Sequence, residues 1–160
     1  MKSPPPAGRK PGDLALLEPG VVVDGYWADR TRPVVAGSPT GEQLRVCEVV
    51  RKANAAASTV LRPGRTGPEI DAAARAVIEE AGYGCAFPHV TGHGLGFGYH
   101  ASAPLLSPSS RDVLEQGMLT SIEPGVCFEP MGGIRIEDDV LVTGNGCEVP
   151  GLFPEFIGRT

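Results

Sequence analysis

The feature that most constrains the fold is a strand-forming pattern that occurs twice in the chain. The segment from Gly12 to Val21 shares six residues with the segment from Gly117 to Val126, at a constant offset of 105 positions. Both segments contain Glu-Pro-Gly-Val, and each is followed by a second apolar run that carries carboxylates. The pattern predicts two similar strand units that face each other across a shared site. Chance similarity is the alternative, because the chain contains 22 glycines and 16 prolines.

The first unit is predicted to be a β-hairpin that turns at Asp24-Gly25, a dipeptide typical of tight two-residue turns. This turn places Gly20 opposite Asp29. Because side chains alternate between the two faces of a strand, Glu18 then lies on the same face as Asp29, one diagonal step away. The alternative is a type II turn at Pro19-Gly20, which would end the strand at Glu18. The same choice applies to the Glu-Pro-Gly of the second unit.

The second unit predicts a hairpin over residues 118–142, with its turn at residues 130–133. If Pro130 is the midpoint of this hairpin, Glu123 and Glu137 lie opposite each other on one face. Glu123 stands inside an apolar run, and a carboxylate buried without a partner is costly. The pattern therefore marks Glu123 as a candidate functional residue.

Two helices are expected between the hairpins. Residues 40–61 begin with a capping box at Thr40 and end at Pro63-Gly64, and residues 66–81 begin with a second capping box and end at Gly82. Residues 83–117 are expected to form loops and short strands. The apolar face of the first helix is predicted to consist of Leu44, Cys47, Val50, Asn54, Ala57 and Leu61.

The predicted fold class is α+β, with a curved antiparallel sheet of two hairpins and two main helices on its outer face. Residues 1–11 are expected to be a tail or connector, residues 12–150 a single domain, and residues 151–160 an irregular tail. The net charge of −5 argues against nucleic acid or an anionic membrane as partner. The sequence has no apolar run of about 18 residues and no apolar N-terminal leader, which predicts a cytoplasmic protein without a membrane span.

The hairpins and the segment between them carry four carboxylates and an imidazole, namely Glu18, Asp29, His93, Glu123 and Glu137. Oxygen-rich sites with one imidazole suit Mn, Co, Fe or Zn, and two such ions can be held by a set of this size. Converging carboxylates would repel one another without a cation, so bound metal is expected to stabilise the fold. The alternative is that each carboxylate is solvated and that His93 is structural.

Taken together, five motifs resemble those of the pita-bread metallopeptidases, a family that includes methionine aminopeptidases, Xaa-Pro aminopeptidases and Xaa-Pro dipeptidases. The resemblance covers residues 11–150. Two side chains, His89 and Arg135, favour the Xaa-Pro branch. The motifs are Gly25-Tyr26-Trp27-Ala28-Asp29-Arg30-Thr31-Arg32, Pro88-His89-Val90-Thr91-Gly92-His93-Gly94-Leu95-Gly96, His100, Ile122-Glu123-Pro124-Gly125 and Ile134-Arg135-Ile136-Glu137-Asp138-Asp139.

The resemblance implies that five side chains bind two divalent metal ions. By motif position, Asp29 and Glu137 would bridge the two ions. His93 and Glu123 would complete the ligands of one ion, and Glu18 those of the other.

The resemblance also implies roles in catalysis. Glu123 would move the proton of the attacking water, and His89 and His100 would contact the substrate and stabilise the developing oxyanion. Arg135 is expected to contact the substrate or the metal ligands. The implied reaction is the attack of a metal-bound hydroxide on a peptide carbonyl, which removes the N-terminal residue of a peptide.

Three departures from the family pattern affect these expectations. Glu18 stands where the family has an aspartate, so the metal that it would complete is in doubt. Ala101 follows His100 where an acidic residue is usual. The family's amino-terminal half is missing, so we expect a truncated or split product, a homo-oligomer, or a separate chain that supplies the missing surface.

Two other functions remain open. A hydrolase of the same fold could cleave a non-peptide C–N bond, as the creatinase-like and ectoine-hydrolase-like relatives do. A chain that has lost the reaction could act as a binding module.

Overall fold

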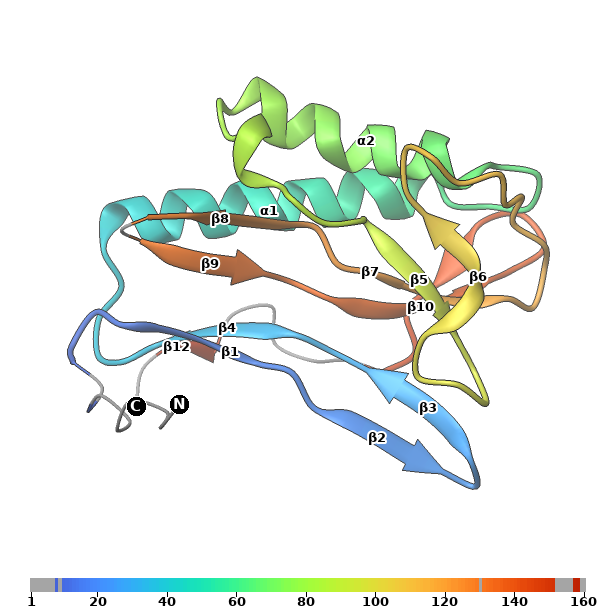
Figure 1. Ribbon diagram of the computed structural model, residues 1–160, viewed down its shortest axis with the longest axis horizontal. Helices are drawn as coiled ribbons and strands as arrows, with labels where there is room; N and C mark the ends of the chain where they lie inside the picture. Colours follow the sequence, from blue (N-terminus) through green and yellow to red (C-terminus); the bar gives the residue numbers. More distant parts are fainter. Residues whose placement is uncertain (1–7, 9, 130, 152–156, 159–160) are drawn as a thin grey trace, which may run out of the picture.

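The computed structural model describes residues 8, 10–129, 131–151 and 157–158 (Figure 1). The expected tail over residues 1–11 and the expected irregular tail over residues 151–160 lie largely outside these ranges. Within the described part, no helix is long and apolar enough to cross a membrane.

Two helices form one outer layer of the molecule (Figure 1). Helix α1 covers Gly41–Val60 and helix α2 covers Gly67–Glu80, followed by the short 3₁₀ helix η1 at Gly84–Ala86. Both predicted capping boxes are present, at Thr40 and at Thr66, where each threonine and the side chain three positions later satisfy each other's backbone amide. The sequence therefore determines where both helices begin.

The strands of the described residues form four small sheets. In the first, β1 and β4 pair antiparallel, and β12 adds to β4 in parallel, although a tail without strands was expected there. In the second, the order is β11-β10-β7-β5-β6, while β2–β3 and β8–β9 are two-stranded hairpins. The bounds are β1 (Leu14–Leu17), β2 (Gly20–Val23), β3 (Tyr26–Asp29), β4 (Arg32–Val35), β5 (Gly92–Leu95), β6 (Ala101–Leu106), β7 (Leu119–Ile122), β8 (Gly125–Phe128), β9 (Gly132–Arg135), β10 (Asp138–Val142), β11 (Cys147–Glu148) and β12 (Ile157–Gly158).

The predicted repeat is present as two split hairpins. Strands β1 and β7 begin 105 positions apart, and so do β2 and β8. The second unit has one additional residue in its turn, so β3 and β9 are offset by 106 positions. In both units one strand ends just before Glu-Pro and the next strand begins just after it. The prediction of a continuous strand through Glu18 is therefore wrong.

The register of both hairpins agrees with the prediction. Gly20 pairs with Asp29, across a turn in which Asp24 has φ 52° and Gly25 has φ 84°. Positive φ at both central residues is what a type I′ turn requires. In the second unit, the β7–β10 pair and the β8–β9 pair follow the same register on the two sides of Glu123-Pro124. This register places Glu123 opposite Glu137.

The two units meet at equivalent positions. Thr31 forms an antiparallel bridge with Glu137, its counterpart at the offset of 106. The next residues in each unit, Arg32 and Asp138, are also counterparts, and their side chains form an ion pair at 2.5 Å. Contacts between equivalent residues indicate a local two-fold relation between the units.

One predicted helix face is wrong in part. Leu44 was expected to be buried, but it is 50% exposed, whereas its neighbour Gln43 is buried. Gln43 completes the capping box and donates a hydrogen bond from its side-chain amide to the Gly12 carbonyl at 2.9 Å. This contact with the first strand unit turns the helix so that the face from Val46 to Ala57 enters the core.

Candidate metal centre

Three of the predicted ligands converge. Asp29, His93 and Glu137 each offer one ligand atom, and these atoms all lie within 4.8 Å of one another. Asp29 ends β3, His93 lies in β5, and Glu137 lies between β9 and β10, so both strand units and the connecting segment contribute. All three residues are buried. The repeat therefore brings together side chains that are far apart in the sequence.

Glycines allow β5 to hold His93 in place. A Cβ at Gly92 would lie 2.0 Å from the Ser121 carbonyl oxygen, and one at Gly94 would lie 2.2 Å from the Ala103 carbonyl oxygen. Only glycine permits so close an approach of two backbones. Strand β5 is thus closely packed between β7 and β6, and His93 is directed into the site.

A hydrogen bond orients the imidazole of His93. Its Nδ1 lies 3.1 Å from the Gly94 carbonyl oxygen, which can only accept, so Nδ1 carries the proton. In the neutral imidazole the lone pair is then on Nε2. This is the usual arrangement of a metal-binding histidine, whose second nitrogen donates to a fixed acceptor.

Two buried carboxylate oxygens have no hydrogen-bond donor among the described residues. They are Oδ1 of Asp29 and Oε1 of Glu137. Buried polar atoms are normally satisfied, so each such oxygen needs an explanation. A divalent cation explains both, because oxygens of two carboxylates together with an imidazole nitrogen are the donors that such ions take.

Burial without a cation changes the ionisation of the carboxylates. Desolvation, followed by the charge of Glu123, raises the pKa of Glu137 to about 8. Desolvation likewise raises the pKa of Asp139 to about 6, although its carboxylate accepts a hydrogen bond from the Asp29 amide at 3.1 Å. These shifts show that the site is destabilised in its fully ionised form.

Glu123 lies beside the three converging residues. Its Oε1 is 3.5 Å from Nε2 of His93 and accepts a hydrogen bond from the Ser121 hydroxyl at 3.1 Å. Its backbone amide donates to the Thr91 carbonyl at 2.7 Å. Burial raises the pKa of Glu123, whereas the charge of Arg135 lowers it. Glu123 is therefore placed to bind the same cation or to exchange a proton next to it.

Glu18, like Glu123, is a predicted ligand that is not one of the three converging residues. It lies between β1 and β2, and its side chain is 43% exposed. Its Oε2 accepts a hydrogen bond from Nη2 of Arg135. The guanidinium of Arg135 also donates to the Thr31 hydroxyl, which in turn donates to Glu137.

The other two predicted histidines lie near the site. His100 is exposed and stacks on His93, with ring centroids 4.0 Å apart and planes inclined by 22°. His89 is half-buried, and its Nε2 would lie 2.9 Å from a Cβ at Gly125, so only glycine leaves it this room. Its charge also lowers the pKa of Glu123.

Sequence reasoning missed a group on helix α2 that supports His89. Arg75 donates to the carbonyls of Phe87 and His89, both at 3.0 Å. Asp71 accepts from Arg75 at 2.8 Å and from the Thr91 hydroxyl at 2.8 Å. The spacing of Asp71 and Arg75, four residues apart on a predicted helix, was the available signal.

Tyr99 was also missed. Its ring packs against Trp27 at 5.1 Å between centroids, and burial together with a hydrogen bond to Asp29 raises its pKa. No periodicity or motif marked it, because it lies in the glycine-rich segment between β5 and β6.

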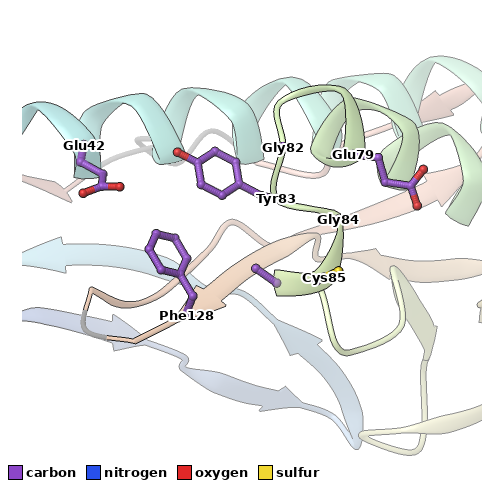
Figure 2. Close-up of a pocket in the computed structure, with 8 residues that line it drawn as sticks. Glu42, Glu79, Gly82, Tyr83, Gly84, Cys85 and Phe128 are labelled. Atoms are coloured by element: carbon purple, nitrogen blue, oxygen red, sulfur yellow. The ribbon is translucent and has the colours of Figure 1, made fainter.

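A separate pocket of about 470 Å³ lies between the start of α1, the end of α2 and β8 (Figure 2). Tyr83 and Phe128 stack within it at 5.7 Å, and Glu42 and Glu79 also line it. None of the converging ligands is among its lining residues. The three converging residues and this pocket are therefore separate features.

The fold and the site define a class of protein. A duplicated strand unit, backed by two helices, presents carboxylates and an imidazole to one buried point, as in the metal-binding proteins of the pita-bread fold. In sequence, residues 2–144 match metallopeptidase family M24. The chain is also 42% identical over 137 residues to the Xaa-Pro dipeptidase of Pyrococcus furiosus. The aligned region covers 86% of this chain and 39% of that protein.

Solved structures agree with the sequence match. The Xaa-Pro dipeptidase from Bacillus anthracis has a TM-score of 0.89 at 40% identity, over 94% of this chain and 42% of that one. The prolidase from Pyrococcus horikoshii OT3 has a TM-score of 0.87 at 39% identity, over 92% of this chain and 43% of that one. This chain therefore belongs to metallopeptidase family M24 and contains part of the pita-bread fold. It spans about 40% of the length of these relatives.

Proposed function

We propose that this chain carries the metal-binding part of a hydrolase of the Xaa-Pro peptidase type, which removes the N-terminal residue of a peptide substrate. The observation that supports it most is the convergence of Asp29, His93 and Glu137, with two buried oxygens that lack donors among the described residues. The names of the relatives point to the same reaction, since they are Xaa-Pro dipeptidases and peptidases. The proposal applies to the site, whatever further protein completes the substrate pocket.

A divalent cation bound here would polarise the scissile carbonyl and lower the pKa of the attacking water. Asp29, His93 and Glu137 hold the cation in this proposal, with Glu123 beside them. The resemblance implies two ions, of Mn, Co, Fe or Zn, of which the second would depend on Glu18.

The remaining side chains act on protons and on the developing charge. Glu123 accepts the proton of the attacking water, because its carboxylate lies at the edge of the ligand set and its pKa is raised by burial. His100, which stacks on His93 and is exposed, donates to the carbonyl oxygen as negative charge develops on it. His89 faces the same region from the segment that Arg75 holds.

The test is hydrolysis of Xaa-Pro dipeptides and of longer peptides with proline in the second position, in the presence of Mn²⁺ or Co²⁺. We expect Glu123→Gln to lower kcat by about 100-fold or more, because general acid–base catalysis contributes roughly that much. Glu48→Gln, on the exposed face of α1, is the matched control. A protein that binds metal tightly yet cleaves none of these substrates contradicts the assignment.

A further inference from the structure

Two buried hydroxyls contact the carboxylates of the candidate metal centre. Thr31 is fully buried, and its Oγ1 donates to Oε2 of Glu137. Ser121 is also fully buried, and its Oγ donates to Oε1 of Glu123 at 3.1 Å. A hydroxyl carries one proton and two lone pairs, and the proton rotates towards the best acceptor. The other neighbours of each hydroxyl oxygen therefore decide where its proton points.

The guanidinium of Arg135 sets the direction of the Thr31 proton. Nε and Nη2 of Arg135 lie 3.3 Å and 3.2 Å from Oγ1 of Thr31, and a guanidinium can only donate. Thr31 accepts on this side, so its own proton is left for Oε2 of Glu137. The other oxygen of Glu137, Oε1, is buried and has no donor among the described residues. The hydroxyl thus determines which oxygen of Glu137 stays open to a cation.

A backbone amide sets the direction of the Ser121 proton in the same way. The amide of His93 donates to Oγ of Ser121 at 3.0 Å, so the hydroxyl proton is free to bind Oε1 of Glu123. This carboxylate oxygen lies 3.5 Å from Nε2 of His93, and Oε2 of Glu123 lies 3.9 Å from Nε of Arg135. Both oxygens of Glu123 therefore have a defined neighbour, and the carboxylate is held with one edge towards His93.

Both arrangements run from an N–H group through a hydroxyl to a carboxylate oxygen. A carboxylate oxygen can take a cation beside one hydrogen bond, because it has more than one lone pair. Such a hydroxyl therefore limits the rotation of a carboxylate without blocking its use as a ligand. Groups that hydrogen-bond a metal ligand in this way tune the affinity of a site although they do not bind the ion.

We propose that Thr31 and Ser121 are positioning residues, whose hydroxyl protons hold the carboxylates of Glu137 and Glu123 in the orientation that a divalent cation requires. The inference rests on the proposed function, which assigns the cation site. Neither hydroxyl is a ligand in this proposal, and each is needed for full affinity.

Variants that remove only a hydroxyl test this inference. Thr31→Val keeps the branched shape of the side chain, and Ser121→Ala removes one oxygen. We expect each to weaken Mn²⁺ binding by about 10- to 100-fold, the loss typical of a group that orients a ligand. Equilibrium dialysis of chelator-stripped protein measures the Kd. Ser107→Ala is the matched control and should bind Mn²⁺ as the parent does, because Ser107 is buried but its hydroxyl lies beside that of Ser109.

A further variant separates the hydroxyl of Thr31 from its packing. Thr31→Ser lacks the methyl group but keeps the hydroxyl, so we expect it to restore the affinity of the parent. A role in packing alone would instead make Thr31→Val, with its complete branched shape, the better binder of the two. Circular dichroism melts check that the variants fold, and Thr31→Ala replaces Thr31→Val if the valine variant does not.

The possible results distinguish this inference from the proposed function. If folded Thr31→Val or folded Ser121→Ala binds Mn²⁺ as tightly as the parent, the inference is overturned and the proposed function stands. The same holds if Thr31→Ser loses as much affinity as Thr31→Val. A parent chain that binds no Mn²⁺ overturns both.

Discussion

Asp71 shows how much one buried side chain outside the ligand set contributes. It is 1% exposed, and it joins Arg75 on its own helix to Thr91 on the segment that leads into β5. Arg75 in turn holds the carbonyls of Phe87 and His89. Because Thr91 also accepts the backbone hydrogen bond of Glu123, helix α2 fixes both a candidate substrate contact and a candidate acid–base group.

We expect Asp71→Asn to lower the free energy of unfolding by about 3 kcal/mol, because it leaves a partly buried guanidinium without its charge partner. Urea denaturation followed by circular dichroism measures the change. Glu80→Gln, an exposed carboxylate near the end of the same helix, is the control and should change stability by less than about 0.5 kcal/mol. Equal stability of the two variants would show that Arg75 is satisfied by the backbone carbonyls alone.

The carboxylates of the site also predict a pH dependence of the metal-free protein. The folded-state pKa of Glu137 is about 8, above the ordinary value of 4.5, and that of Asp139 is about 6. Folding therefore favours the protonated forms, so stability is greatest below the ordinary pKa and falls as pH rises towards 8. We expect the Tm of chelated protein to decrease between about pH 4.5 and pH 8.

Glu137→Gln should remove most of this dependence, since it replaces the ionising group with a neutral one of the same shape. Saturating Mn²⁺ should reverse the trend in the parent chain, because ligand binding requires the ionised carboxylates. A Tm of the chelated parent that rises steadily over this range would contradict the raised pKa values.

At the scale of elements, the close contact of the β5 backbone with the backbones of β6 and β7 depends on Gly92 and Gly94. A methyl group at Gly94 would overlap the Ala103 carbonyl of β6. We expect Gly94→Ala to cost about 1–3 kcal/mol of stability through overpacking. It should also weaken Mn²⁺ binding, because His93 is the adjacent residue. Urea denaturation measures the change in stability, and equilibrium dialysis with Mn²⁺ measures the change in metal binding.

Gly98→Ala is the matched control for Gly94→Ala. Gly98 belongs to the same glycine-rich stretch, but a Cβ there meets nothing within 4 Å. The control should fold and bind Mn²⁺ as the parent does. If both variants lose metal equally, the loss comes from the flexibility of the stretch and not from the position of β5.

Element boundaries were predictable wherever a local signal determined them. The threonine caps predicted the starts of both helices, and Asp24-Gly25 predicted the first turn and its register. The prediction that Leu44 is buried was wrong, because the buried face of α1 depends on a long-range contact between Gln43 and Gly12. The family motifs supplied the converging ligands, whereas Thr31 and Tyr99 were missed because their contacts with the ligands are not local.

At the scale of the whole molecule, one surface stands out for its apolar side chains. Strands β1 to β3 lie at the opposite side of the molecule from the helices (Figure 1). They expose apolar residues. Val23 is 66% exposed and Val21 is 52% exposed, and residues two apart on a strand share a face. Exposed patches of this kind mark surfaces that associate with another protein. The exposed apolar residues of β1 to β3 are Leu16, Leu17, Val21, Val22, Val23 and Tyr26.

We expect the purified chain to self-associate with increasing concentration, and Val21→Ser with Val23→Ser to shift it towards the monomer. Sedimentation velocity over a range of concentrations measures the shift. Val149→Ser removes an exposed valine from another part of the surface and is the control. A chain that stays monomeric at all concentrations would show that β1 to β3 tolerate water without a partner.

The bridge between Thr31 and Glu137 also ties the site to the seam between the two strand units. Thr31 follows Asp29 by two residues, so this one backbone contact holds a candidate ligand from each unit. A change that separates the two units therefore also separates the carboxylates of Asp29 and Glu137.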